Sequence, residues 1–172
     1  MIFKYEIPNF KSHKNLLINL IDNNINYCFK TKYETISKTD WGLPVNLKEE
    51  YWSYLKKEIL VNFNKDFLNK VNAKKIHYNN YWFQIYELGD SHSTHRHPNC
   101  MFTNIIFLNL PEEKLKTNVW DLNGKKLDLT VKEGDIITFP SYLLHESPKN
   151  IFLERKIIVS FNINIEGTKN LC

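Results

Sequence analysis

The chain is short of cysteine and has no long apolar run. Its three cysteines are odd in number and none has C-x-x-C spacing, which argues against a disulfide framework and a zinc knuckle. No stretch approaches the roughly 18 apolar residues of a membrane helix, and the first residues lack the form of a secretion signal. We therefore expect reduced thiols, no membrane partner and a cytoplasmic location.

Arginine is also scarce. Of the 23 basic residues only Arg96 and Arg155 are arginines, and the lysines that supply the net charge of +4 are scattered, so no nucleic-acid surface is indicated. A guanidinium binds carboxylates through two parallel hydrogen bonds, whereas an ammonium does not. Although an AT-rich coding sequence would also explain the scarcity, we expect a geometric role for arginine here, above all for Arg155.

What the chain does contain favours an α+β fold. Aromatic residues make up 14% of its 172 residues, which suits β-strands better than a helix bundle. No linker or repeat divides it, so we expect one domain, 1–172, with a mostly helical part (1–75) and a sheet core (76–166). Two helices are predicted, at about 12–26 and, after an apparent capping box at Asn46–Glu49, along a four-residue aromatic and aliphatic stripe from Leu47 to Phe67. The predicted strands are 2–7, 81–88, 101–110, 127–131, 136–139 and 156–165.

Four of the six histidines occur in two places. His92, His95 and His97 lie together before an apolar strand, and His145 follows a later one. Residues two apart point to the same face of an extended strand, so His95 and His97 can share a side. A third imidazole from His145 would complete a metal site with open coordination positions.

The order of motifs resembles the Fe(II)/2-oxoglutarate-dependent dioxygenases, and among them the small prolyl-4-hydroxylase-like proteins of bacteriophages and bacteria. The resemblance covers about residues 81–165. Its elements are Gly89-Asp90, His95-Arg96-His97-Pro98, an apolar strand, the G-D-x-x-x-F-P-S segment from Gly134 to Ser141 with its Pro140, Leu144-His145, Glu154-Arg155 and Ser160-Phe161-Asn162. A phage-encoded protein would fit this branch.

The resemblance implies a double-stranded β-helix, or jelly roll, and a set of ligands. By position, Fe(II) would be held by His95, His97 and His145. The far carboxylate of 2-oxoglutarate would be held by Arg155 or by Lys156. Because strand neighbours point to opposite faces, only one of the two can reach the cavity, and we favour Arg155 for its planar fork. Further hydrogen bonds to 2-oxoglutarate are expected from Tyr86, Thr103 and Asn104.

One departure from the family concerns the metal ligands. His97 stands where the family has an acid, and the usual facial triad of such iron enzymes contains a carboxylate. Three neutral imidazoles leave the site one unit more positive, which favours an anionic co-substrate but disfavours a highly oxidised iron. Asp90 and Glu146 are the alternative carboxylates, although neither has the family's spacing.

The activity implied is oxidative decarboxylation of 2-oxoglutarate with dioxygen, coupled to oxidation of an unknown substrate. That substrate could be a peptide, for instance at a proline, or a small molecule, and the loop Thr39–Gly42 is expected at its entrance. Two alternatives remain. One is a three-histidine cupin-type dioxygenase that does not use 2-oxoglutarate; the other is an inactive binding or structural protein on the same fold.

Overall fold

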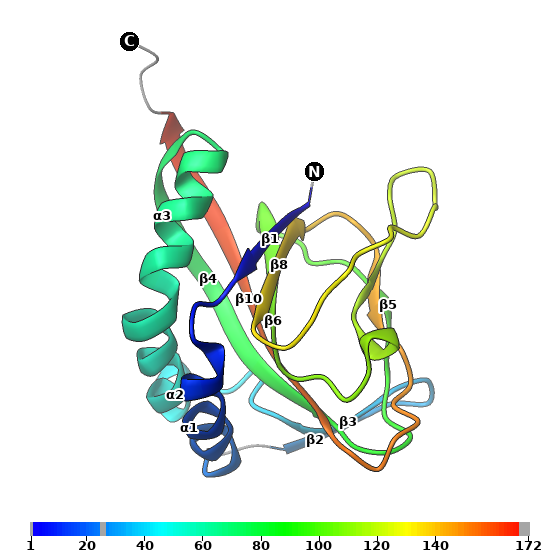
Figure 1. Ribbon diagram of the computed structural model, residues 1–172. Coiled ribbons are helices and arrows are strands. Elements are labelled where there is room, and N and C mark those ends of the chain that lie inside the picture. The colour runs from blue at the N-terminus through cyan, green and yellow to red at the C-terminus, as the bar shows by residue number, and fades with distance from the viewer. Residues whose placement is uncertain (1, 25–26, 169–172) are drawn as a thin grey trace.

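The computed structural model describes residues 2–24 and 27–168, and its architecture is two antiparallel sheets that face each other (Figure 1). The larger sheet has the strand order β1-β8-β6-β10-β4-β3-β2, and the smaller has the order β5-β9-β7. The strands are β1 (Phe3–Glu6), β2 (Tyr27–Lys30), β3 (Thr35–Thr39), β4 (Ala73–Tyr86), β5 (His92–His95), β6 (Phe102–Asn109), β7 (Asn118–Val119), β8 (Asp135–Pro140), β9 (His145–Ser147) and β10 (Lys156–Thr168). Two antiparallel sheets with helices on one side agree with the predicted α+β class and jelly roll.

The helices cover the outer face of the larger sheet, where the helix at Leu60–Lys70 runs beside β4 and β10 (Figure 1). They are α1 (Phe10–Asp22), α2 (Glu49–Tyr54), a π-helical turn (Leu55–Ile59) and α3 (Leu60–Lys70), with 3-10 turns at Val45–Leu47 and Glu113–Leu115. The first helix begins two residues earlier than predicted, and its predicted end at residue 26 lies outside the described residues. The capping box is wrong: Lys48 occupies the N-cap of α2, and no side chain caps that end.

The π-helical turn explains how the four-residue stripe stays on one face. In an α-helix a four-residue step turns about 400°, so successive side chains drift by about 40°. A π turn places an extra residue in one turn of the helix and offsets that drift. Five members of the stripe are consequently buried against the sheet: Tyr51, Leu55, Ile59, Phe63 and Phe67. The first predicted member, Leu47, lies in the preceding 3-10 turn and is exposed.

Alternation along the two central strands separates the helix side of the sheet from the space between the sheets. On β4, Phe83 and Ile85 pack into the helix-side core, whereas Trp82, Gln84 and Tyr86 point between the sheets. The antiparallel partner β10 repeats this division, with Ile157, Val159 and Phe161 on the helix side. The polar side chains of the candidate site therefore come from alternate positions of buried strands.

Several predicted element bounds are corrected by the structure. Residues 127–131 form no strand; the isolated Trp120–Lys126 bridge lies just before them. The predicted boundary between the helical part and the sheet core, at residue 76, falls inside β4. The part before it supplies three strands of the larger sheet, β1, β2 and β3, as well as the helices. Five short strands, β2, β3, β5, β7 and β9, were not predicted, because a run of two to five residues carries little periodicity.

The structure also bears on the expectations from composition. None of the helices in the described ranges is long and apolar enough to cross a bilayer. Cys28 and Cys100 carry free thiols, and Cys172 lies outside the described residues.

Candidate metal centre

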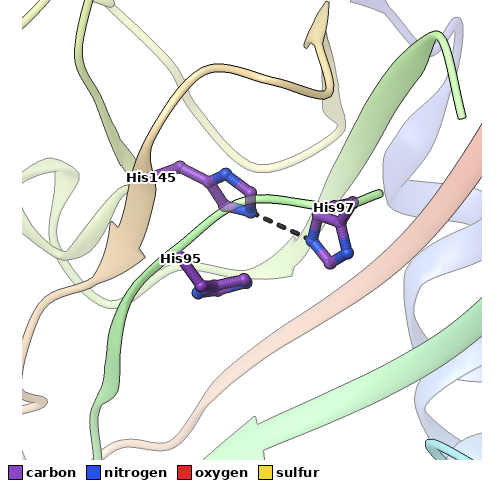
Figure 2. Close-up of side chains that lie close together, drawn as sticks. All are labelled: His95, His97 and His145. Carbon is purple, nitrogen blue, oxygen red and sulfur yellow. Dashed lines mark hydrogen bonds between the residues drawn. The ribbon is translucent and has the colours of Figure 1, made fainter. Parts of the chain in front are cut away.

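Three histidines meet between the sheets. His95 ends β5 and is paired in register with His145 on β9, while His97 follows two residues further along the chain. One nitrogen from each of the three rings lies within 4.8 Å of the others (Figure 2). The structure thus brings together the three side chains that the sequence singled out.

Backbone carbonyl groups orient two of these rings. Nδ1 of His95 donates to the Ser93 carbonyl at 2.7 Å, and Nδ1 of His145 donates to the Leu143 carbonyl at 3.1 Å. With the proton held on Nδ1, the lone pair of Nε2 is free to bind a metal ion, which is the usual role of such outer hydrogen bonds. Nε2 of His145 lies 3.1 Å from Nε2 of His97. About 3 Å separates two nitrogens that bind one ion at about 2.1 Å and at right angles, so this pair fits a shared metal.

Burial keeps the cluster uncharged. It lowers the pKa of His97 to about 4 and holds the pKa of His95 and His145 below the ordinary histidine value, and the neighbouring imidazoles lower those of His97 and His145 further. At neutral pH all three rings are therefore neutral, the form in which histidine binds metals.

No carboxylate joins this cluster within the residues that the structure describes. Glu146 accepts hydrogen bonds from Thr94 and Asn118, at 2.9 and 3.0 Å. Asp90 closes its own turn by accepting the Glu87 backbone N–H at 2.7 Å, and it also accepts hydrogen bonds from Ser37. Both alternative carboxylates therefore make hydrogen bonds away from the three imidazoles.

A fourth histidine packs against the cluster. The His92 ring stacks on His95 with centroids 4.1 Å apart, and its Nε2 lies 3.7 Å from a carboxylate oxygen of Glu34. Glu34 in turn accepts the Ser93 backbone N–H at 2.8 Å. Sequence reasoning missed Glu34, which belongs to the loop between two short strands and has no local motif.

Lys156 is the cation that reaches the space between the sheets. Its side chain is fully buried, Nζ donates to the Ser147 hydroxyl at 2.7 Å, and it lies 5.1 Å from the centre of the Tyr86 ring. No carboxylate of the described residues pairs with it. Burial lowers the Lys156 pKa to about 7, because the charged ammonium loses its hydration there and no counter-ion of the described residues replaces it.

Arg155 lies on the other face, and the preference for it is corrected. Its guanidinium makes two hydrogen bonds to the Asp22 carboxylate at the end of α1, at 2.8 and 2.7 Å. The guanidinium does bind a carboxylate through two parallel hydrogen bonds, as the sequence suggested, but the carboxylate belongs to α1 and the pair joins that helix to the sheet. Because neighbouring residues of an extended chain point to opposite sides, Lys156 faces the histidines.

Two buried hydroxyl groups between the sheets have no hydrogen-bond partner within the described residues. They belong to Tyr86 and Thr117, and both residues line a narrow inner pocket beside the histidines. Buried hydroxyls without partners are uncommon, so these two are suited to bind polar atoms of a ligand. This pocket measures about 20 Å³, room for about one water molecule, so its side chains must shift to admit a dicarboxylate.

The remaining predicted ligand-binding residues divide between the two faces of β6. Thr103 points between the sheets, where its hydroxyl donates to Asn162 at 3.0 Å. Asn104 points to the opposite side, donates to the Phe161 carbonyl and accepts from Thr138, so the structure does not bring it to the histidines.

Ser147 and Thr117 are among the pocket residues that sequence reasoning missed. Ser147 lies two residues after His145 on the same strand, and the strand's alternation could have identified it. Thr117 precedes the two-residue strand β7, and no sequence signal marks it.

Solved structures with the same fold include a 2OG-Fe(II) oxygenase and two prolyl hydroxylases. An oxidoreductase of the 2OG-Fe(II) oxygenase family from Burkholderia pseudomallei matches with a TM-score of 0.73 and 11% identity, over 98% of this chain and 88% of that one. A Pseudomonas putida prolyl-4-hydroxylase matches with a TM-score of 0.66 and 13% identity, over 96% and 93%. The viral collagen prolyl hydroxylase of Paramecium Bursaria Chlorella virus-1, solved as a 2OG complex, matches with a TM-score of 0.56 and 17% identity, over 94% of each chain.

The comparison by sequence gives no match. No family model matches the chain, and no curated protein matches it. The chain therefore shares the fold of 2OG-Fe(II) oxygenases over nearly its whole length, at identities at which only the fold is established.

Proposed function

We propose that the protein is an Fe(II)- and 2-oxoglutarate-dependent oxygenase. His95, His97 and His145 would hold the metal, and Lys156 would hold the far carboxylate of 2-oxoglutarate. The observation that carries this proposal is the fully buried Lys156 amine, which has no carboxylate partner among the described residues and donates to Ser147, a residue that lines the pocket beside the three imidazoles. A buried cation without a counter-ion favours an anionic ligand.

The residues of the chain would bind and orient this ligand. Lys156 supplies the charge, and the free Tyr86 and Thr117 hydroxyls supply hydrogen bonds to carboxylate oxygens. With no carboxylate among the metal ligands, the site keeps the full charge of the ion, and that further favours a dianionic co-substrate.

The metal and co-substrate would supply the hard chemistry. When bound with 2-oxoglutarate, Fe(II) activates dioxygen for oxidation of a C–H bond, with succinate and carbon dioxide as co-products. The protein's own part is to hold the ligands and to exclude bulk water. Phe139, whose ring lies 4.9 Å from that of His145, and Trp82, 5.4 Å from that of His97, provide apolar cover on two sides.

The test is an anaerobic titration followed by addition of oxygen. Fe(II) and 2-oxoglutarate together should give a weak visible charge-transfer band with the intact protein and none with His145→Ala. Succinate should then form when oxygen is admitted. If the intact protein shows no band under conditions where it remains folded, the proposal is wrong.

The same experiment separates the two alternative functions. A cupin-type dioxygenase would consume oxygen with a thiol substrate, independently of 2-oxoglutarate and of Lys156. A binding protein on this fold would take up the metal and give no succinate. The absence of a carboxylate ligand is the observation that makes the second alternative worth testing.

A further inference from the structure

A second, larger cavity adjoins the inner pocket, and the two share His95 and His97 among their lining residues. It measures about 240 Å³ and is bordered by side chains from β2, β3, β4 and the segment after β5. Trp41 and Thr39 of the predicted entrance loop line it, whereas Asp40 of that loop is buried and accepts a hydrogen bond from Tyr51. The cavity touches His95 and His97 directly, so a molecule within it would lie beside the metal site.

Aromatic rings form much of its wall. The Phe29 and Trp41 rings meet edge to face at 5.8 Å, and Trp82, which is almost completely buried, lies next to His97. Trp41 is about half exposed, at 48%, although it is a large apolar side chain. Rings of this kind bind flat or apolar groups through stacking and burial of apolar surface.

The charge of the lining residues favours an anionic ligand over a cationic one. Among the described residues that line the cavity, none carries a carboxylate, and Arg96 is the only one with a permanently charged side chain. Unlike Arg155, which is paired with Asp22, Arg96 forms no ion pair with any carboxylate in the described ranges. An aromatic cavity that bound a cation would be expected to offer an acidic group, so this lining favours an anion.

We propose that the outer cavity binds the substrate, and that this substrate is a small ring compound bearing a carboxylate or phosphate group. The ring would lie against Trp41 and Trp82, and the anionic group would be bound by the guanidinium of Arg96. The inference rests on the proposed function, because it takes the neighbouring histidines as the reaction centre. The volume of about 240 Å³ is below that of most pockets for drug-sized ligands, which fits a compound of one or two rings.

The test measures binding without turnover. Protein loaded with Mn(II) and saturating 2-oxoglutarate is titrated in a calorimeter with indole-3-acetate, phenylacetate and phenyl phosphate, and with the neutral amides of the two acids. The acids or the phosphate ester should bind about tenfold or more tightly than the amides, as a charge-assisted guanidinium contact predicts. Comparison of phenylacetate with phenyl phosphate identifies which anion the site prefers.

Two variants and a matched control locate the contacts. Arg96→Gln should abolish the preference of acid over amide, whereas Arg155→Gln, which removes the same charge on the opposite face, should leave it intact. Trp41→Ala should weaken the acid and the amide alike, because it removes the ring contact and no charge.

Three results would overturn the inference. They are equal affinities for acids and amides, an Arg96→Gln protein that keeps the preference, and tighter binding of a neutral proline tripeptide, blocked at both ends, than of any anion tested. The last result would indicate a peptidyl substrate. Each leaves the proposed function intact, because the charge-transfer band and succinate formation report on the metal and 2-oxoglutarate independently of this cavity.

Discussion

Two adjacent basic residues have opposite roles in this protein. Arg155 pairs with Asp22 and joins α1 to the sheet, while Lys156 points inward and is fully buried, with no carboxylate of the described ranges beside it. Arginine suits the first position because its fork matches a carboxylate. Lysine suits the second because a compact ammonium with a depressed pKa can lie among aromatic and hydroxyl groups until an anion arrives.

Replacing Lys156 should separate stability from ligand binding. Lys156→Met removes a buried amine that has no counter-ion, so the free energy of unfolding at pH 7 should rise, by up to a few kcal/mol. The same change should weaken 2-oxoglutarate binding about 30-fold or more. Urea denaturation and calorimetric titration measure the two effects. Arg155→Gln is the control: it should lower stability and leave 2-oxoglutarate affinity unchanged.

The depressed pKa of Lys156 also predicts a pH dependence. Above pH 7 the amine is neutral, so binding of the dicarboxylate must take up a proton, and affinity should fall by up to about tenfold per pH unit. The histidine ligands, with pKa values below the ordinary histidine value, stay neutral in this range. Titrations between about pH 6.5 and 8.5, in two buffers of different ionisation enthalpy, measure the proton uptake.

The same pKa sets the sign of the stability effect. Between the folded value of about 7 and the ordinary value of 10.5, the unfolded chain binds a proton that the folded chain does not. The contribution of Lys156 to the free energy of unfolding must therefore rise with pH across that window. A slope that is unchanged in Lys156→Met would show that this amine is not the group responsible.

His97 offers a direct test of the missing carboxylate. His97→Asp should retain a metal ion, because a carboxylate is an accepted ligand beside two histidines. The site loses one positive charge, and 2-oxoglutarate affinity should fall by about an order of magnitude. Equilibrium dialysis gives the metal content and the visible band gives the affinity. Loss of the metal in both His97→Asp and His97→Ala would contradict this expectation.

At the scale of elements, very short strands position the site. β5 and β9 have four and three residues, yet their antiparallel register places His95 opposite His145. The tight turn at Gly134 directly precedes β8, and the chain continues from the end of β8 to His145. Gly134 has φ of +82°, and an added Cβ would lie 2.6 Å from the Phe10 ring, so both its conformation and its contact require glycine.

Substitution of this glycine should be costly, and the chain supplies a matched comparison. Gly134→Ala should lower the free energy of unfolding by about 2–4 kcal/mol, because it adds backbone strain to a clash with Phe10. Gly124→Ala has a similar φ of +76° with open space around the Cβ, so only the strain, about 1 kcal/mol, should appear. Denaturant melts of both variants test the difference. Equal losses would show that the Phe10 contact has no effect.

At the scale of the whole molecule, the helices and the site lie on opposite faces of one sheet. The aromatic core under α2 and α3 stabilises β4 and β10 from outside, and the same strands present Trp82, Tyr86 and Lys156 to the space between the sheets. The smaller sheet contributes His95 and His145 across that space. A metal ion would therefore join segments that are otherwise held by few backbone pairs.

Metal binding should consequently stabilise the folded protein. An ion present at about 100 times its dissociation constant adds about 2.7 kcal/mol if the unfolded chain does not bind it. For a domain of this size that corresponds to an increase in Tm of about 5 °C or more. Thermal melts with Mn(II) and with a chelator measure the shift. His145→Ala should show no difference between the two conditions.

The sequence by itself determined the class of fold, the main strands and the three histidines. These rest on local signals: the change from helical to strand periodicity near residue 75, the His95-Arg96-His97 spacing and the Gly134 turn. Only the tertiary structure decided which basic residue faces the site, that Thr117 and Glu34 belong near it, and that Arg96 borders a cavity. The physical reason is that a one-residue shift along a strand moves every one of its side chains to the opposite face of the sheet. Short strands carry too little periodicity to fix that phase, so their pairing partners must do so.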